Sequence, residues 1–260
     1  MSNYIFKAKT TSAFTIKTLS EVLQNILTDV CFEFSENGIK LTTIDNKEPP
    51  ELLIDLHLDK KQFFPYYCEK TFKIGITLQH LYKLLKSVKK KDTLELFIDS
   101  NNTENLGICT TTENGQKSFS YIKIQRVRQV SIEIPTGYVN YHLIKTSGFQ
   151  KLCKDISSIS NKVKVYSKGE YLSFASVFDK VYTRVVPFGE MDPESTDEEY
   201  EDYFNTKSLT QLIKIAGLHS NMHIYMKQDL PLKISVSVGD LGVIDVFLKS
   251  ISQLEEENEE

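Results

Sequence analysis

The chain has 260 residues, of which 40% are hydrophobic and 25% are charged, and its formal net charge is −4. A chain of this length can bury one large hydrophobic core or two ordinary ones. No apolar run approaches the roughly 20 residues of a membrane-spanning helix, and the N-terminal sequence MSNYIFKAKT lacks the apolar core of a signal peptide. We therefore expect a soluble protein of the cytosol or the nucleus that binds no membrane.

The acidic residues are unevenly distributed. Many of them lie in two runs, at residues 190–202 and 255–260, so that the remainder of the chain is basic on balance. Runs of this kind are usually solvated, and we expect one to be a loop and the other a tail. The negative net charge therefore does not exclude a nucleic-acid partner, because a basic surface can lie elsewhere on the protein.

The four cysteines, Cys31, Cys68, Cys109 and Cys153, stand far apart and include no C-x-x-C pair. This spacing fits neither a zinc site nor the disulfide framework of a small secreted protein. We expect all four to be reduced thiols packed within the fold.

Short stretches of alternating apolar residues, separated by turns that contain glycine, dominate the pattern. Asn-Gly occurs between two such stretches at 37–38 and again at 114–115, which is a strong signal of a β-hairpin. Lys-Gly at 168–169 and the glycine-containing turn at 239–242 separate two further pairs. The sequence predicts a protein built mainly of antiparallel strands.

Four segments instead have the period of an amphipathic helix, and they come in two pairs. Their apolar stripes are Phe14, Leu19, Val22, Leu23 and Ile26; Leu78, Leu81, Tyr82 and Leu85; Phe149, Leu152, Cys153 and Ile156; and Leu209, Leu212, Ile213 and Ala216. The first helix of each pair precedes a strand, a glycine-containing turn and a second strand, at 30–41 and 163–172. This indicates an internal repeat of about half the chain, divided near residues 124–140.

Lysines recur on the face of these helices opposite the apolar stripe. They are Lys17, Lys83, Lys86, Lys90, Lys151, Lys154, Lys207 and Lys214. Surface helices often carry lysines for solubility alone, but repetition on all four segments suits a surface that follows a phosphate backbone without reading bases. We find neither a helix with clustered base-reading side chains nor aromatic residues interleaved with the lysines.

Sequence signatures of catalysis are missing. The chain contains no phosphate-binding G-x-x-x-x-G-K-[ST] loop, no G-x-S-x-G elbow and no H-E-x-x-H pair. His219 and His223 are four residues apart, but the strand-like residues around them make a shared helical face and a metal site improbable. Asp45, Glu48 and Glu51 flank two prolines, which predict an extended loop with ordinary carboxylates. We expect no enzyme activity, no cofactor and no metal.

Four segments carry a family resemblance: GIKLTTID at 38–45, the expected second helix at 78–96, SGFQKLCKDISSI at 147–159, and 229–248. In order and spacing they resemble the DNA sliding clamps of the proliferating cell nuclear antigen family along the whole chain. The resemblance implies an α+β fold with two similar domains, antiparallel sheets outside and four helices lining a ring of three chains. It implies a domain at 1–123, a connector at 124–140, a second domain at 141–254 and an acidic tail at 255–260.

The implied function is that of a processivity factor, which encircles duplex DNA without sequence preference and has no chemistry of its own. The lysines would then face the DNA. A DNA polymerase, a clamp loader and clients such as a flap nuclease and a ligase would be partners, in the nucleus or in a viral replication compartment. Abundant lysine, isoleucine and asparagine indicate an AT-rich genome, such as that of a protist or a large DNA virus.

In this family, client peptides bind a hydrophobic groove beneath the connector. The corresponding residues here are Ile44, Pro49, Ile132, Ile134, Pro135, Pro231 and Phe247. The connector departs from the family, since Arg126 and Arg128 replace acidic residues, and this predicts clients with acidic flanks. Lys249 and Ser250 replace a small residue and a proline, so the end of the groove also departs from the family.

Ring closure in the family pairs an edge strand from each half of neighbouring chains. The resemblance assigns these edges to 117–123 and 181–187, with Ser118, Tyr121, Tyr182 and Arg184 at the contact. A subunit of a heterotrimeric checkpoint-type clamp and a monomeric viral processivity factor remain alternatives with the same fold. A nuclease would need clustered carboxylates with metal geometry, which the sequence does not offer.

Overall fold

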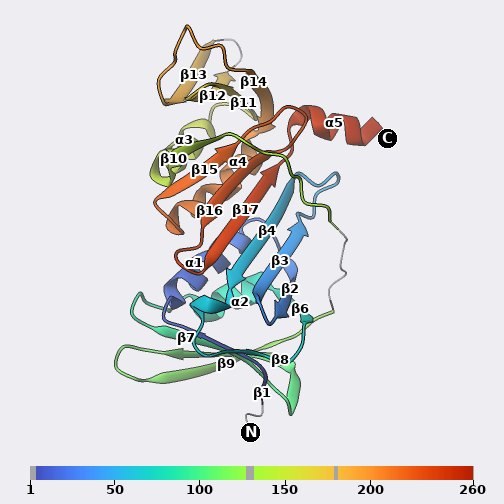
Figure 1. The fold of residues 1–260 in the computed structure, drawn as a ribbon, viewed down its shortest axis with the longest axis vertical. Helices are drawn as coiled ribbons and strands as arrows, with labels where there is room; N and C mark the ends of the chain where they lie inside the picture. Colours follow the sequence, from blue (N-terminus) through green and yellow to red (C-terminus); the bar gives the residue numbers. More distant parts are fainter. Residues whose placement is uncertain (1–3, 127–131, 179–180, 260) are drawn as a thin grey trace. The chain divides into compact units, whose positions relative to one another are not determined.

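A computed structural model of the chain describes residues 4–126, 132–178 and 181–259 (Figure 1). The chain folds into two compact units. Unit 1 consists of Met1–Thr43, Asp55–Ile132 and Ser237–Ile244. Unit 2 consists of Ile44–Ile54, Glu133–Val236 and Asp245–Glu260. Each unit therefore takes one short segment from the opposite half of the sequence.

Unit 1 holds most of the first half of the repeat. Its elements are β1 (Tyr4–Thr10), α1 (Ala13–Gln24), β2 (Asp29–Ser35), β3 (Gly38–Ile44), β4 (Leu52–Asp59), the 3-10 turn η1 (Lys60–Gln62), β5 (Tyr66–Cys68), β6 (Phe72–Thr77), α2 (Leu78–Leu85), β7 (Thr93–Asp99), β8 (Asn102–Thr111) and β9 (Lys117–Lys123). One sheet has the order β5-β1-β7-β8-β9, and β6-β2-β3-β4 are neighbours in the second. The strand pairs are antiparallel, for example Phe6 of β1 opposite Ile98 of β7.

Unit 2 holds most of the second half. Its elements are β10 (Tyr141–Lys145), α3 (Thr146–Ile156), β11 (Lys162–Lys168), β12 (Tyr171–Phe178), β13 (Tyr182–Phe188), β14 (Glu199–Asn205), α4 (Thr206–Gln211), the 3-10 segment η2 (Leu212–Gly217), β15 (Asn221–Tyr225), β16 (Leu232–Ser237), β17 (Gly242–Leu248) and α5 (Ile251–Glu259). One sheet has the order β13-β12-β11-β14, and β10-β15-β16-β17 are neighbours in the other. The predicted α+β fold with antiparallel sheets is therefore confirmed.

The internal repeat is visible in the order of elements. Strand, helix, strand, turn and strand follow one another as β1-α1-β2-β3 and again as β10-α3-β11-β12. The turn of the first copy needs a glycine, because Gly38 has φ +140° and an added Cβ would lie 2.0 Å from the carbonyl oxygen of Leu58. The predicted Asn-Gly hairpin at 37–38 is confirmed by the pairing of Ser35 with Gly38.

Helix positions follow the predicted apolar stripes, but two helices end earlier than expected. Leu23, Leu85, Phe149 and Leu209 are each at most 1% exposed. The second helix ends at Leu85, and a turn occupies residues 86–92 before β7 begins. The fourth changes from α-helix to 3-10 geometry after residue 211. Apolar periodicity reports the buried face of a helix and contains little information about where its hydrogen bonds stop.

The expectation that the acidic runs form a loop and a tail is partly wrong. Residues 251–259 form helix α5, whose first turn carries a capping box. The backbone N–H of Ser250 donates to Gln253 Oε1 (2.9 Å), and the N–H of Gln253 donates to Ser250 Oγ (3.3 Å). The other run ends in strand β14, where Glu199 and Glu201 pair with lysines of β11. Opposite charges across neighbouring strands explain why acidic residues are tolerated in a strand there.

The cysteines of the described residues are free thiols, as predicted. Cys109 and Cys153 are buried, whereas Cys31 and Cys68 are half-buried. Burial raises the pKa of Cys153 to about 12, which keeps that thiol protonated and unreactive. Within the same described part of the chain, no helix is long and apolar enough to cross a membrane.

Candidate nucleic-acid interface and partner surfaces

The lysines of unit 1 lie on two neighbouring helical segments. Lys83, Lys86 and Lys90 are exposed, but only Lys83 lies within α2; Lys86 caps that helix and Lys90 belongs to the following turn. Lys17 of α1 is half-buried, and its ammonium donates to the carbonyl oxygen of Val88 at 3.3 Å. The expected i, i+3, i+7 spacing on one helix is therefore wrong for Lys90.

An aromatic ring links two of these cations. The ammonium of Lys17 lies 5.1 Å from the ring centroid of Phe14, and that of Lys90 lies 5.9 Å from the same centroid. The face of an aromatic ring attracts cations and reduces the cost of bringing them close together. The ring of Phe14 is thus close to two ammonium groups, one from α1 and one from the turn after α2.

Unit 2 carries its four predicted lysines on a similar pair of segments. Lys151 and Lys154 lie on α3, Lys207 on α4 and Lys214 on η2, and all four side chains are exposed. Helix α3 contacts both α4 and η2. Within each unit, therefore, the predicted lysines lie on or near neighbouring helical segments, and all of them except Lys17 are exposed, an arrangement suited to contact with a phosphate backbone.

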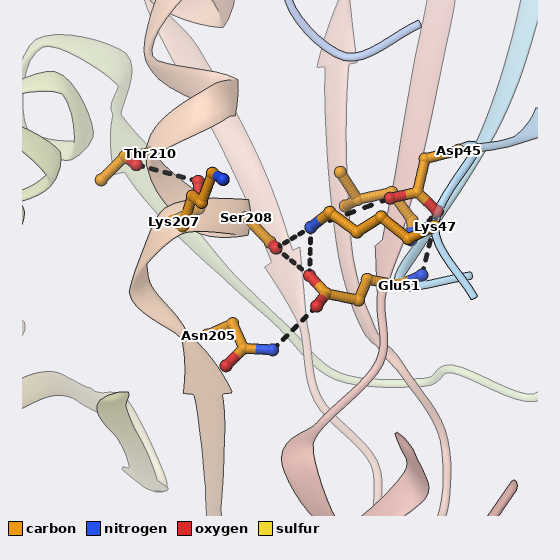
Figure 2. Close-up of polar contacts among 8 residues, drawn as sticks. Asp45, Lys47, Glu51, Asn205, Lys207, Ser208 and Thr210 are labelled. Carbon is orange, nitrogen blue, oxygen red and sulfur yellow. Dashed lines mark hydrogen bonds and ion pairs between the residues drawn. The ribbon is translucent and has the colours of Figure 1, made fainter. Parts of the chain in front are cut away.

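The loop between β3 and β4 is held against the start of α4 by a polar network (Figure 2). The ammonium of Lys47 lies 2.5 Å from Glu51 Oε2 and donates to Ser208 Oγ at 2.7 Å. Ser208 Oγ also donates to Glu51 Oε2. Asn205 donates its side-chain N–H to Glu51 Oε1 at 2.9 Å. All of these residues belong to unit 2.

Asp45 stabilises the same loop through hydrogen bonds to its backbone. Its Oδ1 accepts hydrogen bonds from the backbone N–H groups of Glu51 (2.9 Å) and Leu52 (3.3 Å). Burial raises the pKa of Asp45, although these hydrogen bonds and nearby Lys47 oppose the rise. Burial would also raise the pKa of Glu51, but hydrogen bonds from Lys47, Ser208 and Asn205 hold it below its usual value.

These carboxylates therefore serve the structure of the loop. Asp45 is only 5% exposed, and Asp45 and Glu51 are both engaged by N–H or O–H donors, so they are more than the ordinary loop carboxylates expected from sequence. No cluster of three potential metal ligands occurs among the described residues. The sequence analysis missed Lys47, Asn205 and Ser208; the i, i+4 spacing of Lys47 and Glu51 was the one local signal available.

The predicted groove residues are distributed over both units. Ile44, Pro49, Pro135 and Pro231 are half-buried, and Ile134 is 37% exposed, all in unit 2. Ile132 is half-buried and belongs to unit 1. Phe247 is only 1% exposed, so its ring lies beneath the surface.

Tyr138 covers Phe247 and was not predicted. Its hydroxyl donates to the carbonyl oxygen of Pro231 at 2.7 Å, and the centroids of its ring and that of Phe247 are 6.1 Å apart. The ammonium of Lys233 lies 5.4 Å from the Phe247 centroid and pairs with Asp245 at 2.7 Å. The signal available in the sequence was a tyrosine directly after the Pro135–Gly137 turn.

Of the two connector arginines, Arg126 is exposed and Arg128 lies outside the described residues.

The predicted contact strands β9 and β13 each stand at the end of a sheet. Tyr121 of β9 is 58% exposed, and Ser118 is exposed too. On β13, Tyr182 is 50% exposed, and exposed Arg184 pairs with Asp155 at 2.5 Å.

Comparison with known proteins finds two family models in sequence order. The N-terminal domain of proliferating cell nuclear antigen matches residues 5–132, and its C-terminal domain matches residues 136–251. A probable DNA polymerase sliding clamp of Paramecium bursaria Chlorella virus 1 is 30% identical over 96% of this chain and 98% of its own.

Two relatives from cellular organisms are more distant. Proliferating cell nuclear antigen 2 of Plasmodium falciparum is 26% identical over 84% of this chain and 85% of its own. Proliferating cell nuclear antigen of Caenorhabditis elegans is 23% identical over 94% of this chain and 96% of its own. The similarity thus extends over both units.

Proposed function

The chain belongs to the proliferating cell nuclear antigen family, and we propose on this basis that it is a DNA sliding clamp that raises the processivity of a DNA polymerase. The observation that carries the proposal is the match of both clamp domains, in order, to a chain whose two units each carry lysines on or near neighbouring helical segments. Such a protein acts by encircling DNA, which requires no catalytic group. We propose that the protein is not an enzyme.

Duplex DNA is the proposed nucleic-acid partner. Lysine ammonium groups neutralise phosphates and release counterions, and this attraction is independent of base sequence. The proposed contacts are the eight lysines described above, from Lys17 to Lys214. Weak contacts of this kind favour sliding, because no single position on the DNA is preferred.

The proposed assembly is a homotrimeric ring. Strands β9 and β13 each offer an open edge, and a sheet edge readily accepts another strand. Pairing β9 of one copy with β13 of the next is a heterologous contact, which closes into a ring if the rotation per copy is one third of a turn. Domains at 1–123 and 141–254, joined by a connector at 124–140, are the proposed building blocks.

Recruitment is proposed to use the groove formed by Ile44, Pro49, Ile132, Ile134, Pro135, Pro231 and Phe247. A client peptide would bury aliphatic and aromatic anchors there. The replication polymerase, a clamp loader, a flap nuclease and a ligase are the proposed clients. Exposed Arg126 supports the proposal that the clients carry acidic residues beside this anchor segment. The proposed location is the nucleus or a viral replication compartment.

Solution mass is the first test. Light scattering of the full chain, through a dilution series into the low micromolar range, should give three times the chain mass of 29.9 kDa. A mass of one chain at every concentration would contradict the homotrimer and would favour a heteromeric clamp or a monomeric processivity factor.

Processivity itself requires a second assay. With the partner polymerase and clamp loader, the protein should lengthen products made on a primed circular template. It should lose this effect on a short linear template, from which an encircling ring slides off. Equal stimulation on both templates would contradict encirclement.

A further inference from the structure

The two halves of the internal repeat differ by one strand position, which no described residue fills in unit 2. In unit 1, β1 lies between two neighbours, with β7 on one side and β5 on the other. β5 pairs through three residues, for example Phe6 opposite Cys68 and Ala8 opposite Tyr66. In unit 2, the corresponding strand β10 pairs with β15 and forms the end of its sheet in the part of the chain that the structure describes (Figure 1).

A cavity of about 1010 Å³ lies beside this strand. It is lined by Tyr141 and His142 of β10, by Ser167 of β11 and by Gly169 of the β11–β12 turn, among others. β5 occupies the equivalent place in unit 1, between β1 and the β2–β3 turn. There Tyr66 of β5 donates its hydroxyl to the carbonyl oxygen of Ser35 at 2.7 Å.

The walls of the cavity are acidic. Five carboxylates line it: Glu170, Asp197, Glu198, Glu199 and Asp229. Lys227 lines it too, and its ammonium donates to the carbonyl oxygen of Gly137 at 3.1 Å. Lys168 pairs with Glu199 at 2.9 Å. His142 adds no positive charge at neutral pH, because burial lowers its pKa. The balance is negative and favours a cationic occupant.

The lining of the cavity also includes a largely buried tyrosine. Tyr200, which is 8% exposed, is one of the residues that line the cavity. Its hydroxyl has no hydrogen-bond partner among the described residues. The hydroxyl is itself buried, so it is not available to an occupant of the cavity.

We propose that the open edge of β10 is a docking site for a basic, extended segment of a partner protein, which adds to the sheet at the position that β5 occupies in unit 1. Main-chain hydrogen bonds to β10 would provide affinity, and lysine or arginine side chains that meet the carboxylates would provide specificity. The lining of this cavity shares no residue with the proposed peptide groove or with the proposed ring contact at β9 and β13. It does not require the chain to be a ring.

The probe is a fluorescent peptide that alternates lysine with valine and tyrosine, added to the full chain. Binding is followed by fluorescence anisotropy, and hydrogen exchange reports which backbone amides become protected. We expect added protection at residues 139–145 and no added protection in β9 or β13. The same peptide with N-methyl groups on alternate residues keeps its charges but cannot pair along a strand, and should bind at least about tenfold more weakly.

A matched pair of substitutions tests the charge. Glu198→Lys changes a wall of the cavity, whereas Glu194→Lys changes an exposed residue of the same loop that does not line it. We expect Glu198→Lys to weaken peptide binding about tenfold and Glu194→Lys to weaken it less than about twofold. Equal losses in both variants, or full affinity for the N-methyl peptide, would overturn the proposal.

The remaining competitor for the edge is a second copy of this chain. If β10 gains protection with rising protein concentration in the absence of peptide, and the peptide reverses that gain, the occupant is another copy. That result would also overturn the proposal that the occupant belongs to a different protein. Neither result depends on the proposed clamp function, whose test is the solution mass and the template assay.

Discussion

Ser208 and Glu51 are 157 positions apart in sequence, yet Ser208 Oγ donates a hydrogen bond to Glu51 Oε2. Lys47 contacts both side chains, so three residues from two distant segments share one buried polar centre. The contact fixes the β3–β4 loop, which follows Ile44 and contains Pro49, against the start of α4, which contains Lys207. A residue of the proposed client groove and a residue of the proposed DNA face are thus supported by the same network.

Replacing Glu51 by alanine should destabilise unit 2. Lys47 and fully buried Ser208 would lose their shared acceptor, and we expect a loss of about 1–3 kcal/mol in the free energy of unfolding at neutral pH. Glu51→Gln should cost less, because an amide oxygen still accepts from Asn205. Urea unfolding measures both. Glu48→Ala, an exposed change in the same loop, is the control and should cost less than about 0.5 kcal/mol.

The contribution of Glu51 should also depend on pH. Its pKa is lowered in the folded protein, so its stabilisation is present above the unfolded pKa of about 4.3 and is lost as pH falls through the folded pKa. The difference in unfolding free energy between the native chain and Glu51→Gln should therefore shrink on acidification below about pH 4. A difference that stays constant with pH would contradict the ionic role of Glu51.

The contribution of Asp45 to stability should depend on pH in the opposite direction. Burial raises its pKa in the folded state, so ionisation opposes folding as pH rises above the unfolded pKa of about 3.9. Asp45→Asn keeps an acceptor for the N–H groups of Glu51 and Leu52, and should leave stability at neutral pH within about 1 kcal/mol of the native chain or raise it. Asp45→Ala removes the acceptor and should cost about 1–3 kcal/mol. Thermal unfolding that ranks asparagine below alanine would contradict this account.

The exposed lysines of α2 should contribute to DNA affinity through counterion release. Lys83→Ala with Lys86→Ala should reduce the magnitude of the slope of log affinity against log salt by about 2 on duplex DNA, roughly one for each lysine. Anisotropy titrations at several salt concentrations give the slope. Lys7→Ala is the control, because Lys7 pairs with Glu95 on a sheet at 3.1 Å. An equal effect of the control would contradict a specific role for the helical lysines.

Charge placed on the open edge of β9 should prevent assembly. Tyr121→Glu should reduce the solution mass to that of one chain, because a carboxylate would be buried without a partner in the strand contact. The fold should lose no more than about 1.5 kcal/mol, since the main intramolecular loss is the ring contact with Phe97. Phe64→Glu is the matched control, as Phe64 is 91% exposed and lies outside β9 and β13. An assembled Tyr121→Glu variant would contradict the proposed contact.

The capping box at the start of α5 predicts a local effect. Ser250→Ala removes the acceptor for the N–H of Gln253 and should destabilise α5 by about 1 kcal/mol. Hydrogen exchange of residues 251–259 should then quicken severalfold, while exchange in β1 stays unchanged. Glu256→Ala changes an exposed residue of the same helix outside the capping pair and serves as the control.

Much of the fold was predictable from local sequence because its signals are local. The apolar stripes placed Leu23, Leu85 and Phe149 on buried helix faces, and the Asn-Gly pair at 37–38 predicted its hairpin. Helix ends were less predictable. The sequence carries the capping signal Ser250-x-x-Gln253, but the run of acidic residues that follows it is equally typical of a solvated tail.

By itself the sequence determined the class of fold, the repeat, the positions of the lysines and the family, since periodicity, turns and collinear segments are properties of neighbouring residues. Only the tertiary structure decided that Glu51 binds Ser208 and that Tyr138 covers Phe247. It also decided that β10, among the described residues, has no strand in the position that β5 takes beside β1. Each of these depends on which distant segments meet in space. The spacing of residues along the chain cannot specify such contacts, because they are set by the packing of whole sheets and helices around a shared core.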